Sequence, residues 1–127
     1  MPNHIHLQFY YSGGKQNLNT IIGNGKRFMA YGIINRLEER LETKLLERLR
    51  MAVQPKDKVK GQKHEVWQDS FDIKKCITEK FILQKLNYIH WNPCTERWKL
   101  ADHPYNYIHS SASFYELGKK HYPLLKD

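Results

Sequence analysis

Two histidines near the start of the chain, His4 and His6, lie two residues apart in a segment that alternates polar and apolar side chains. On a β-strand, side chains two residues apart point to the same side, so both imidazoles would face one direction. Neutral imidazole is a common ligand for divalent metals, and two imidazoles side by side can bind one cation. Histidines at this spacing also arise by chance on solvent-facing strands. The pair is therefore a candidate metal site that needs support from elsewhere in the chain.

Tyr88 is the second candidate for chemistry, because its segment has helical spacing and the tyrosine lies off the apolar face. Ile82, Leu86 and Ile89 recur at i, i+4 and i+7 and form a stripe that we expect to face the core. Tyr88 lies about 200° around the helix from Leu86, and Asn92, four residues later, shares its face. Considered alone, Tyr88 is better explained by packing, since tyrosine is common at the boundary of a core.

The charge balance favours a polyanionic partner. Among 127 residues, 21 Lys and Arg against 13 Asp and Glu leave a net charge of +8. Binding of phosphates by such a surface releases counterions, which makes nucleic acid a natural partner. A solvated basic surface without a partner is the alternative. The length suits one compact domain spanning residues 1–127.

Cysteine usage and targeting signals indicate a cytoplasmic protein. Cys76 and Cys94 occur in no CxxC or Cys/His spacing, so neither a zinc module nor a disulfide framework is expected. Polar residues follow Met1 directly, which is not the pattern of a signal peptide. No apolar run is long enough to span a bilayer, so we expect no membrane association.

The elements that must position these residues are predicted from periodicity and from capping residues. The alternation in residues 4–11 predicts a strand, and a second short strand is expected at residues 64–73. Helical spacing begins at an N-cap, Asn17 or Asn19, and its glycines predict a short helix, a kink or two helices.

Three further helices and a linker complete the prediction. The spacing predicts a strong amphipathic helix over Arg36–Arg50, followed by a flexible basic linker at residues 55–63, PKDKVKGQK. Thr78 is expected to cap a helix that runs from Glu79 to Trp91 and ends at Pro93. A final short helix is expected at residues 110–117.

Four segments in the right order resemble one known family. They are MPNHIHL at residues 1–7, VWQD at 66–69, LNYIHWNP at 86–93, and the closing pair HPY at 103–105 with SSASFY at 110–115. These motifs resemble those of the REP-associated and insertion-sequence single-tyrosine HUH transposases. The likeness extends from Met1 almost to the C-terminus, and its most specific parts are the histidine pair and the tyrosine helix.

The resemblance implies a role for each candidate. His4 and His6 would bind the catalytic metal, Mg²⁺ or Mn²⁺, Tyr88 would be the nucleophile, and Asn92 would supply a third metal ligand. Because Asn92 precedes a proline, its backbone is expected to depart from helical geometry.

The resemblance also implies a fold, with one departure. The family fold is α+β, a ferredoxin-like antiparallel sheet with helices on one side. Family members usually have a strand, a helix and another strand before the histidine motif, which here begins at residue 3. The resemblance therefore implies a fold that is N-terminally truncated relative to the family. A start codon placed too late, a decayed gene and a second chain that supplies the missing strands all explain this, and the histidine strand needs a cover for its unpaired edge.

The implied function is a metal-dependent transposase or endonuclease of a mobile element. It would cleave and rejoin single-stranded DNA beside hairpins through a 5′-phosphotyrosine intermediate, working as a homodimer. An inactive remnant that binds DNA or RNA hairpins and a phosphodiesterase that uses activated water remain alternatives. Candidate phosphate contacts are basic residues outside the two motifs: Lys15, Lys26, Arg27, Lys56, Lys58, Lys60 and Lys63. Aromatic residues after Tyr88, namely Trp91, Trp98, Tyr105 and Tyr107, either stack on unpaired bases or pack in the core.

Overall fold

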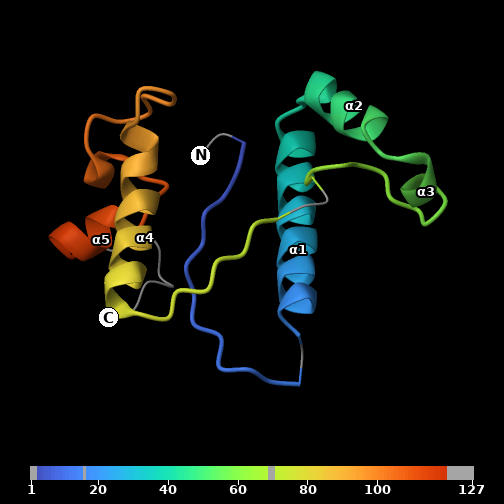
Figure 1. Cartoon of the computed structure of the whole chain (residues 1–127). Helices are drawn as coiled ribbons and strands as arrows, with labels where there is room; N and C mark the ends of the chain where they lie inside the picture. Colours follow the sequence, from blue (N-terminus) through green and yellow to red (C-terminus); the bar gives the residue numbers. More distant parts are fainter. Residues whose placement is uncertain (1–2, 16, 69–70, 120–127) are drawn as a thin grey trace. The chain divides into compact units, whose positions relative to one another are not determined.

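The computed structural model describes residues 3–15, 17–68 and 71–119 (Figure 1). The chain forms two compact units. One combines Met1–Phe9 with Lys74–Asp127, and we call it the tyrosine unit because it contains Tyr88. The other comprises Tyr10–Ile73, and we call it the basic unit because it contains all seven candidate phosphate contacts.

The predicted ferredoxin-like sheet is wrong, because the described residues contain helices and turns but no strand. Residues 4–11 and the described part of residues 64–73 both lie outside regular secondary structure. Alternation of polar and apolar side chains determines which residues share a face, but a strand exists only when a neighbouring backbone pairs with it. The two predicted strands belong to different units, apart from the last residues of the first. Residues 69–70 of the second lie outside the described residues.

The basic unit begins with a long helix, α1, spanning Leu18–Glu39. Asn17, one of the two predicted caps, is its N-cap: the side-chain oxygen accepts from the backbone N–H of Thr20 at 2.8 Å. The helix is continuous through Gly23, Gly25 and Gly32, so the predicted interruption by glycine is not seen. Glycine costs about 1 kcal/mol relative to alanine in a helix, which weakens the helix without breaking its hydrogen-bond ladder.

The predicted helix over Arg36–Arg50 is wrong, because the chain turns between α1 and the next helix, α2, at Thr43–Met51. Leu41 adopts a left-handed conformation with φ of 56°. The N–H of Leu41 donates to the carbonyl of Glu38, and the N–H of Glu42 donates to that of Leu37. These two bonds form a Schellman motif, which satisfies carbonyls at the end of α1 and stops the helix.

A short helix, α3, occupies Pro55–Lys58 inside the predicted basic linker. The segment after it returns to the earlier helices through hydrogen bonds. The N–H of Glu65 donates to the carbonyl of Leu49, and the indole N–H of Trp67 donates to the carbonyl of Lys26 at 2.7 Å. Val53, between α2 and α3, is 3% exposed. These contacts connect the residues after the linker to α1 and α2.

The tyrosine unit is built around helix α4, Glu79–Trp91, with the bounds that the sequence predicts. Thr78 caps it, since its hydroxyl accepts from the backbone N–H of Phe81 at 3.3 Å. A 3-10 helix, η1, continues directly through Asn92–Cys94. The chain therefore keeps helical turns through Asn92, and the expected departure from helical geometry before Pro93 does not occur: φ and ψ of Asn92 are −53° and −43°.

The core of the tyrosine unit forms where two short elements meet α4. These are η2, a 3-10 helix at Pro104–Asn106, and α5 at Ala112–Leu117. The buried residues of α5 are Ala112, Ser113 and Phe114. Among the described residues, no helix has the length and apolar character needed to cross a membrane.

Candidate metal and tyrosine site

Residues 4–8 run along α4 in the opposite direction, within the tyrosine unit (Figure 1). The side-chain amide of Gln8 donates to the carbonyl of Ile82, near the start of the helix, at 3.2 Å. The side-chain amide of Asn92, just beyond the end of the helix, contacts Nε2 of His6 at 2.8 Å. These two hydrogen bonds bring the histidine segment to the helix that carries Tyr88.

The two imidazoles lie edge to face, with ring centroids 4.8 Å apart and ring planes at 79°. Nδ1 of His4 lies 2.7 Å from the side-chain oxygen of Asn3. Because that oxygen only accepts, His4 carries its proton on Nδ1 and presents a lone pair on Nε2. Nε2 of His6 accepts from the Asn92 amide, so it also carries a lone pair. Asn3 thus fixes the tautomer of His4, a role that the histidine spacing alone did not reveal.

Both imidazoles favour the neutral form that metal binding requires. Partial burial lowers the pKa of His4 below its ordinary value, and the positive charge of Arg97 adds to the effect. Partial burial also lowers the pKa of His6, and the neighbouring His4 adds to that shift. The two rings therefore present lone pairs at neutral pH instead of protons.

The residues present fit a hard divalent cation. Asn92 is 8% exposed, and its amide lies against the Nε2 lone pair of His6. Their 2.8 Å separation is close to the spacing of about 3 Å between adjacent ligands of an octahedral ion whose ligand bonds are about 2.1 Å. Rotation of the amide by half a turn would present its oxygen to the same point. Among the described residues, no group of three His, Cys, Asp or Glu side chains is arranged to hold a metal, so the set depends on the amide oxygen.

Tyr88 lies beside this pair and is accessible. Its side chain is 57% exposed, so it points away from the core, as the helical spacing predicts. Its ring centroid lies 5.7 Å from that of His6, with ring planes at 72°. The four predicted residues, His4, His6, Tyr88 and Asn92, therefore meet in one unit of the structure.

Three neighbours of the site, Lys85, Trp98 and Arg97, were not predicted as part of it. The ammonium of Lys85 lies over the Tyr88 ring, 5.7 Å from its centroid. The spacing of three residues on one helix would have identified this cation, because residues i and i+3 are neighbours on a helix surface. Trp98 packs against His4, with ring centroids 5.4 Å apart, and Arg97 lies 5.0 Å above the Trp98 ring. Trp98 therefore supports a metal-ligand candidate as well as presenting an aromatic surface.

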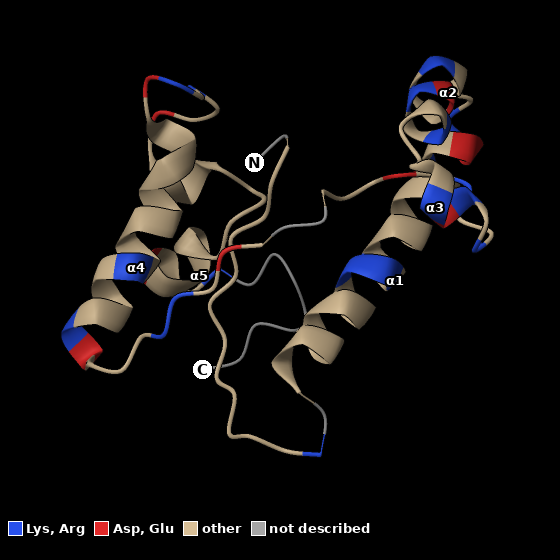
Figure 2. Ribbon diagram, turned by 45° about the vertical axis from the view of Figure 1, so that its right-hand side comes forward, with Lys and Arg blue, Asp and Glu red and all other residues tan. Residues whose placement is uncertain are grey.

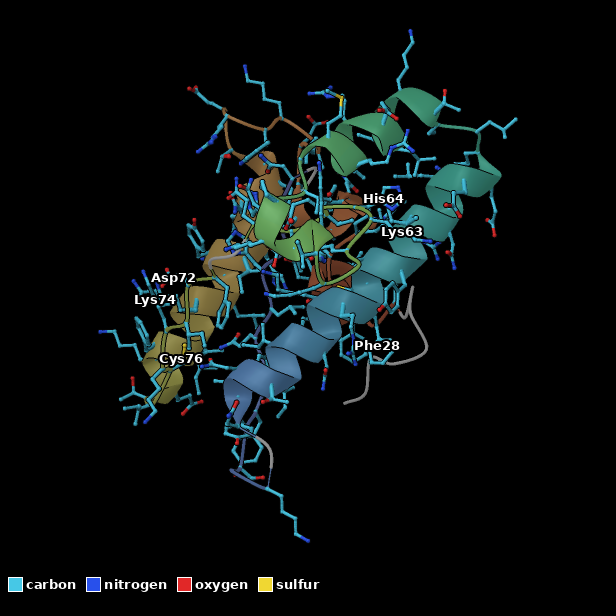
Figure 3. All side chains as sticks on the ribbon, turned by 90° about the vertical axis from the view of Figure 1, so that its right-hand side faces the viewer. Phe28, Lys63, His64, Asp72, Lys74 and Cys76 are labelled. Carbon is cyan, nitrogen blue, oxygen red and sulfur yellow. The ribbon has the colours of Figure 1, made fainter. Side chains whose placement is uncertain are left out.

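The seven candidate phosphate contacts all belong to the basic unit, whereas the four residues of the tyrosine site belong to the tyrosine unit. In Figure 2 the basic positions of this unit gather mainly on α2, α3 and the segment after α3. A surface hollow of about 470 Å³ is lined there by Arg50, Lys58, Gln62, Lys63 and His64. Figure 3 shows Lys63 and His64 side by side on that segment.

Several of the seven have interactions within the unit. The ammonium of Lys26 donates to the carbonyl of Gln68 at 2.6 Å, and Lys60 pairs with Asp57 at 3.2 Å.

Comparison of the chain with family models, with curated proteins and with solved structures found no match.

Proposed function

We propose that this chain cleaves and rejoins single-stranded DNA, with Tyr88 as the nucleophile and a divalent cation bound by His4, His6 and Asn92. One observation carries the proposal: the exposed Tyr88 phenol lies beside His6, whose Nε2 meets Asn92 at 2.8 Å. The motifs that resemble the single-tyrosine HUH transposases supply the reaction class. The geometry supports the proposal independently, since the approach of residues 86 positions apart does not follow from a sequence pattern.

The reaction proceeds by exchange of one phosphate ester for another. The Tyr88 oxygen attacks phosphorus and loses its proton, the bond from phosphorus to the 3′-oxygen breaks, and that oxygen takes up a proton. The products are a 5′-phosphotyrosine linkage and a free 3′-hydroxyl, which can reverse the reaction without ATP. A Mg²⁺ or Mn²⁺ ion at the histidines supplies electrostatic stabilisation of charge on the phosphate. The Lys85 ammonium beside Tyr88 adds a positive charge for the same phosphate.

The substrate that we propose is single-stranded DNA flanked by a hairpin, with the basic unit contributing phosphate contacts. The net charge of +8 and the lysines around the hollow of the basic unit support that assignment. The homodimer and the cytoplasmic location stay predictions.

The test uses one oligonucleotide with a hairpin, labelled at either end and incubated with Mg²⁺ or Mn²⁺. Because the 5′-phosphate joins the tyrosine, a 3′ label becomes attached to protein and survives denaturation, whereas a 5′ label leaves on a shorter strand. Tyr88→Phe removes the nucleophile. Tyr115→Phe is the matched control, because Tyr115 is 60% exposed in the same unit.

Each rival gives a different pattern. The proposal requires a 3′-labelled adduct with the wild type and Tyr115→Phe and none with Tyr88→Phe. Cleavage that forms no adduct and continues in Tyr88→Phe would establish the phosphodiesterase with activated water. Salt-dependent binding with no cleavage would establish the non-enzymatic hairpin binder.

A further inference from the structure

Trp91, the last residue of α4, has a partly exposed indole, although the residues immediately before and after it in the sequence are buried. It is 46% exposed, whereas His90 before it is 6% exposed and Asn92 after it is 8% exposed. Those neighbours are engaged, His90 with the Ser111 hydroxyl at 3.0 Å and Asn92 with His6. The helix therefore ends in a firmly anchored turn that presents an indole to solvent.

The indole is braced from one side by a row of rings. Its centroid lies 5.3 Å from that of His103, with ring planes at 67°. His103 in turn lies 4.0 Å from Tyr105, with ring planes at 37°. Glu116 approaches His103 from α5, with 3.8 Å between the carboxylate oxygen and Nδ1. These contacts restrict the indole while nearly half of its surface stays open, which lowers the entropy lost when a flat ligand stacks on it.

The position of Trp91 relative to Tyr88 indicates what that ligand is. Lys85, Tyr88 and Trp91 are spaced by three residues along α4, so they form one row on the helix surface. The row places a cation, a phenol and an indole in order. A nucleic-acid strand presents the matching groups, a phosphate and next to it a base, and every base has a face that stacks on an aromatic ring.

We propose that Trp91, braced by His103 and Tyr105, is a stacking site for the unpaired base next to the phosphate that Tyr88 attacks. The inference rests on the proposed function for the identity of that phosphate. It adds a substrate contact and a consequence: DNA binding depends on the presence of a base at one position, and the site accepts different bases because stacking tolerates sequence.

The experiment measures binding in the Tyr88→Phe background, so that no strand is cut. A set of labelled single strands carries one abasic position, moved nucleotide by nucleotide past the cleavage site, and fluorescence anisotropy is read at one fixed salt concentration. Loss of the base that stacks on Trp91 should weaken binding about 5- to 150-fold, the range measured for stacking on an aromatic side chain. Trp91→Ala should weaken binding of the intact strand to a similar degree and make it insensitive to that abasic position.

Two variants separate stacking from folding. Trp91→Phe retains a smaller ring and should keep part of the sensitivity to the abasic position. Tyr115→Ala removes another exposed aromatic side chain of the same unit and should leave the sensitivity unchanged. Far-UV circular dichroism identifies any variant that has unfolded. If Trp91→Ala has unfolded, the comparison is made with Trp91→Phe, whose smaller ring should show a reduced sensitivity to the abasic position.

The outcomes distinguish this inference from the proposed function. If the wild type forms the 3′-labelled adduct but Trp91→Ala keeps full dependence on the same base, the stacking site is wrong and the nuclease stands. If no adduct forms but Trp91→Ala removes the dependence on one abasic position, the indole stacks on a base and the nuclease is wrong. If no abasic position matters with an intact Trp91, the indole does not stack on a base.

Discussion

Replacing Asn92 by aspartate tests whether this side chain is a metal ligand. The change keeps the size of the side chain and exchanges the amide nitrogen for a second oxygen. In the structure that nitrogen donates to Nε2 of His6 at 2.8 Å. In the variant an oxygen lone pair would face the imidazole lone pair, and the two repel unless a proton or a cation lies between them. Asn92→Asp therefore makes the site depend on a bound positive charge.

The size of the effect follows from the charges. A carboxylate whose charge centre lies about 3 Å from a divalent ion gains about 3 kcal/mol even at the dielectric constant of water, or roughly 100-fold in affinity. Protons compete, because the new carboxylate raises the pKa of His6, opposite to the effect of burial in the wild type. The gain is therefore expected at about pH 8, above the ordinary histidine pKa, and shrinks as the pH falls.

The assay is a titration with MnCl₂ at about pH 8, in which the electron paramagnetic resonance signal reports free Mn²⁺. Asn87→Asp is the matched control, because Asn87 is an exposed residue of the same helix and the variant has the same net charge. We expect roughly 100-fold tighter Mn²⁺ binding by Asn92→Asp, and little change for Asn87→Asp because exposed charges are screened.

Two results would refute the assignment, provided that the variants keep the circular dichroism spectrum of the wild type. The first is an Asn92→Asp affinity no higher than that of the wild type. The second is an equal gain in both variants, which would show that added negative charge anywhere on the unit attracts Mn²⁺.

Four further outcomes are expected. Lys85→Met should slow adduct formation at least about fivefold, since unit charges about 4 Å apart attract by about 1 kcal/mol even in water. Lys80→Met, on the first turn of α4, should leave the rate unchanged, and equal rates for the two variants in a time course would contradict the role of Lys85. Asn3→Ala should weaken Mn²⁺ binding about 10- to 100-fold through loss of the fixed His4 tautomer, and an unchanged titration would mean that Asn3 does not orient that ring. Burial lowers the pKa of His90 below 6.5, and Glu116 only partly opposes this shift, so the folded state binds the proton less well than the unfolded state. Chemical denaturation without metal should therefore show an unfolding free energy that is level above pH 6.5 and falls below it. The unfolding free energy of His90→Gln should fall less over the same range, and an identical pH profile would contradict the effect. Leu41→Gly should raise the Tm of the basic unit through a gain of up to about 1 kcal/mol, because glycine tolerates a left-handed φ and Leu41 is 80% exposed; a lower Tm would contradict strain at this position.

Local signals predicted where helices start better than where they stop. Thr78 was predicted as a cap, and Asn17 as one of two candidates with Asn19, because a short polar side chain can bond an N–H three residues later. That signal lies within four residues of the chain. The turn at Leu41 was missed because no local signal marks it. Leucines at every fourth position continue the apolar pattern through the break, and leucine is so uncommon in a left-handed conformation that its presence did not indicate a turn.

The sequence predicted the four residues of the candidate site but only some of the residues that surround them. The meeting of His6 and Asn92 joins residues 86 positions apart, which no periodicity determines, and it was expected only through the resemblance. Asn3 and Lys85 were missed although each is close in sequence to a predicted residue. Their roles depend on side-chain direction, the oxygen of Asn3 toward His4 and the ammonium of Lys85 over the Tyr88 ring.

The loss of the predicted sheet changes what positions the histidines. On a sheet, backbone hydrogen bonds to neighbouring strands would fix both imidazoles whether or not a metal is bound. In the described residues, side-chain contacts with α4 position them instead, chiefly Gln8 with Ile82 and Asn92 with His6. Each such bond contributes about 1 kcal/mol net, so packing of the histidine segment against α4 is only weakly favoured. A bound cation would stabilise the packed state. Because Asn92 is both a docking contact and a candidate ligand, binding of the metal and positioning of His6 beside Tyr88 become one event.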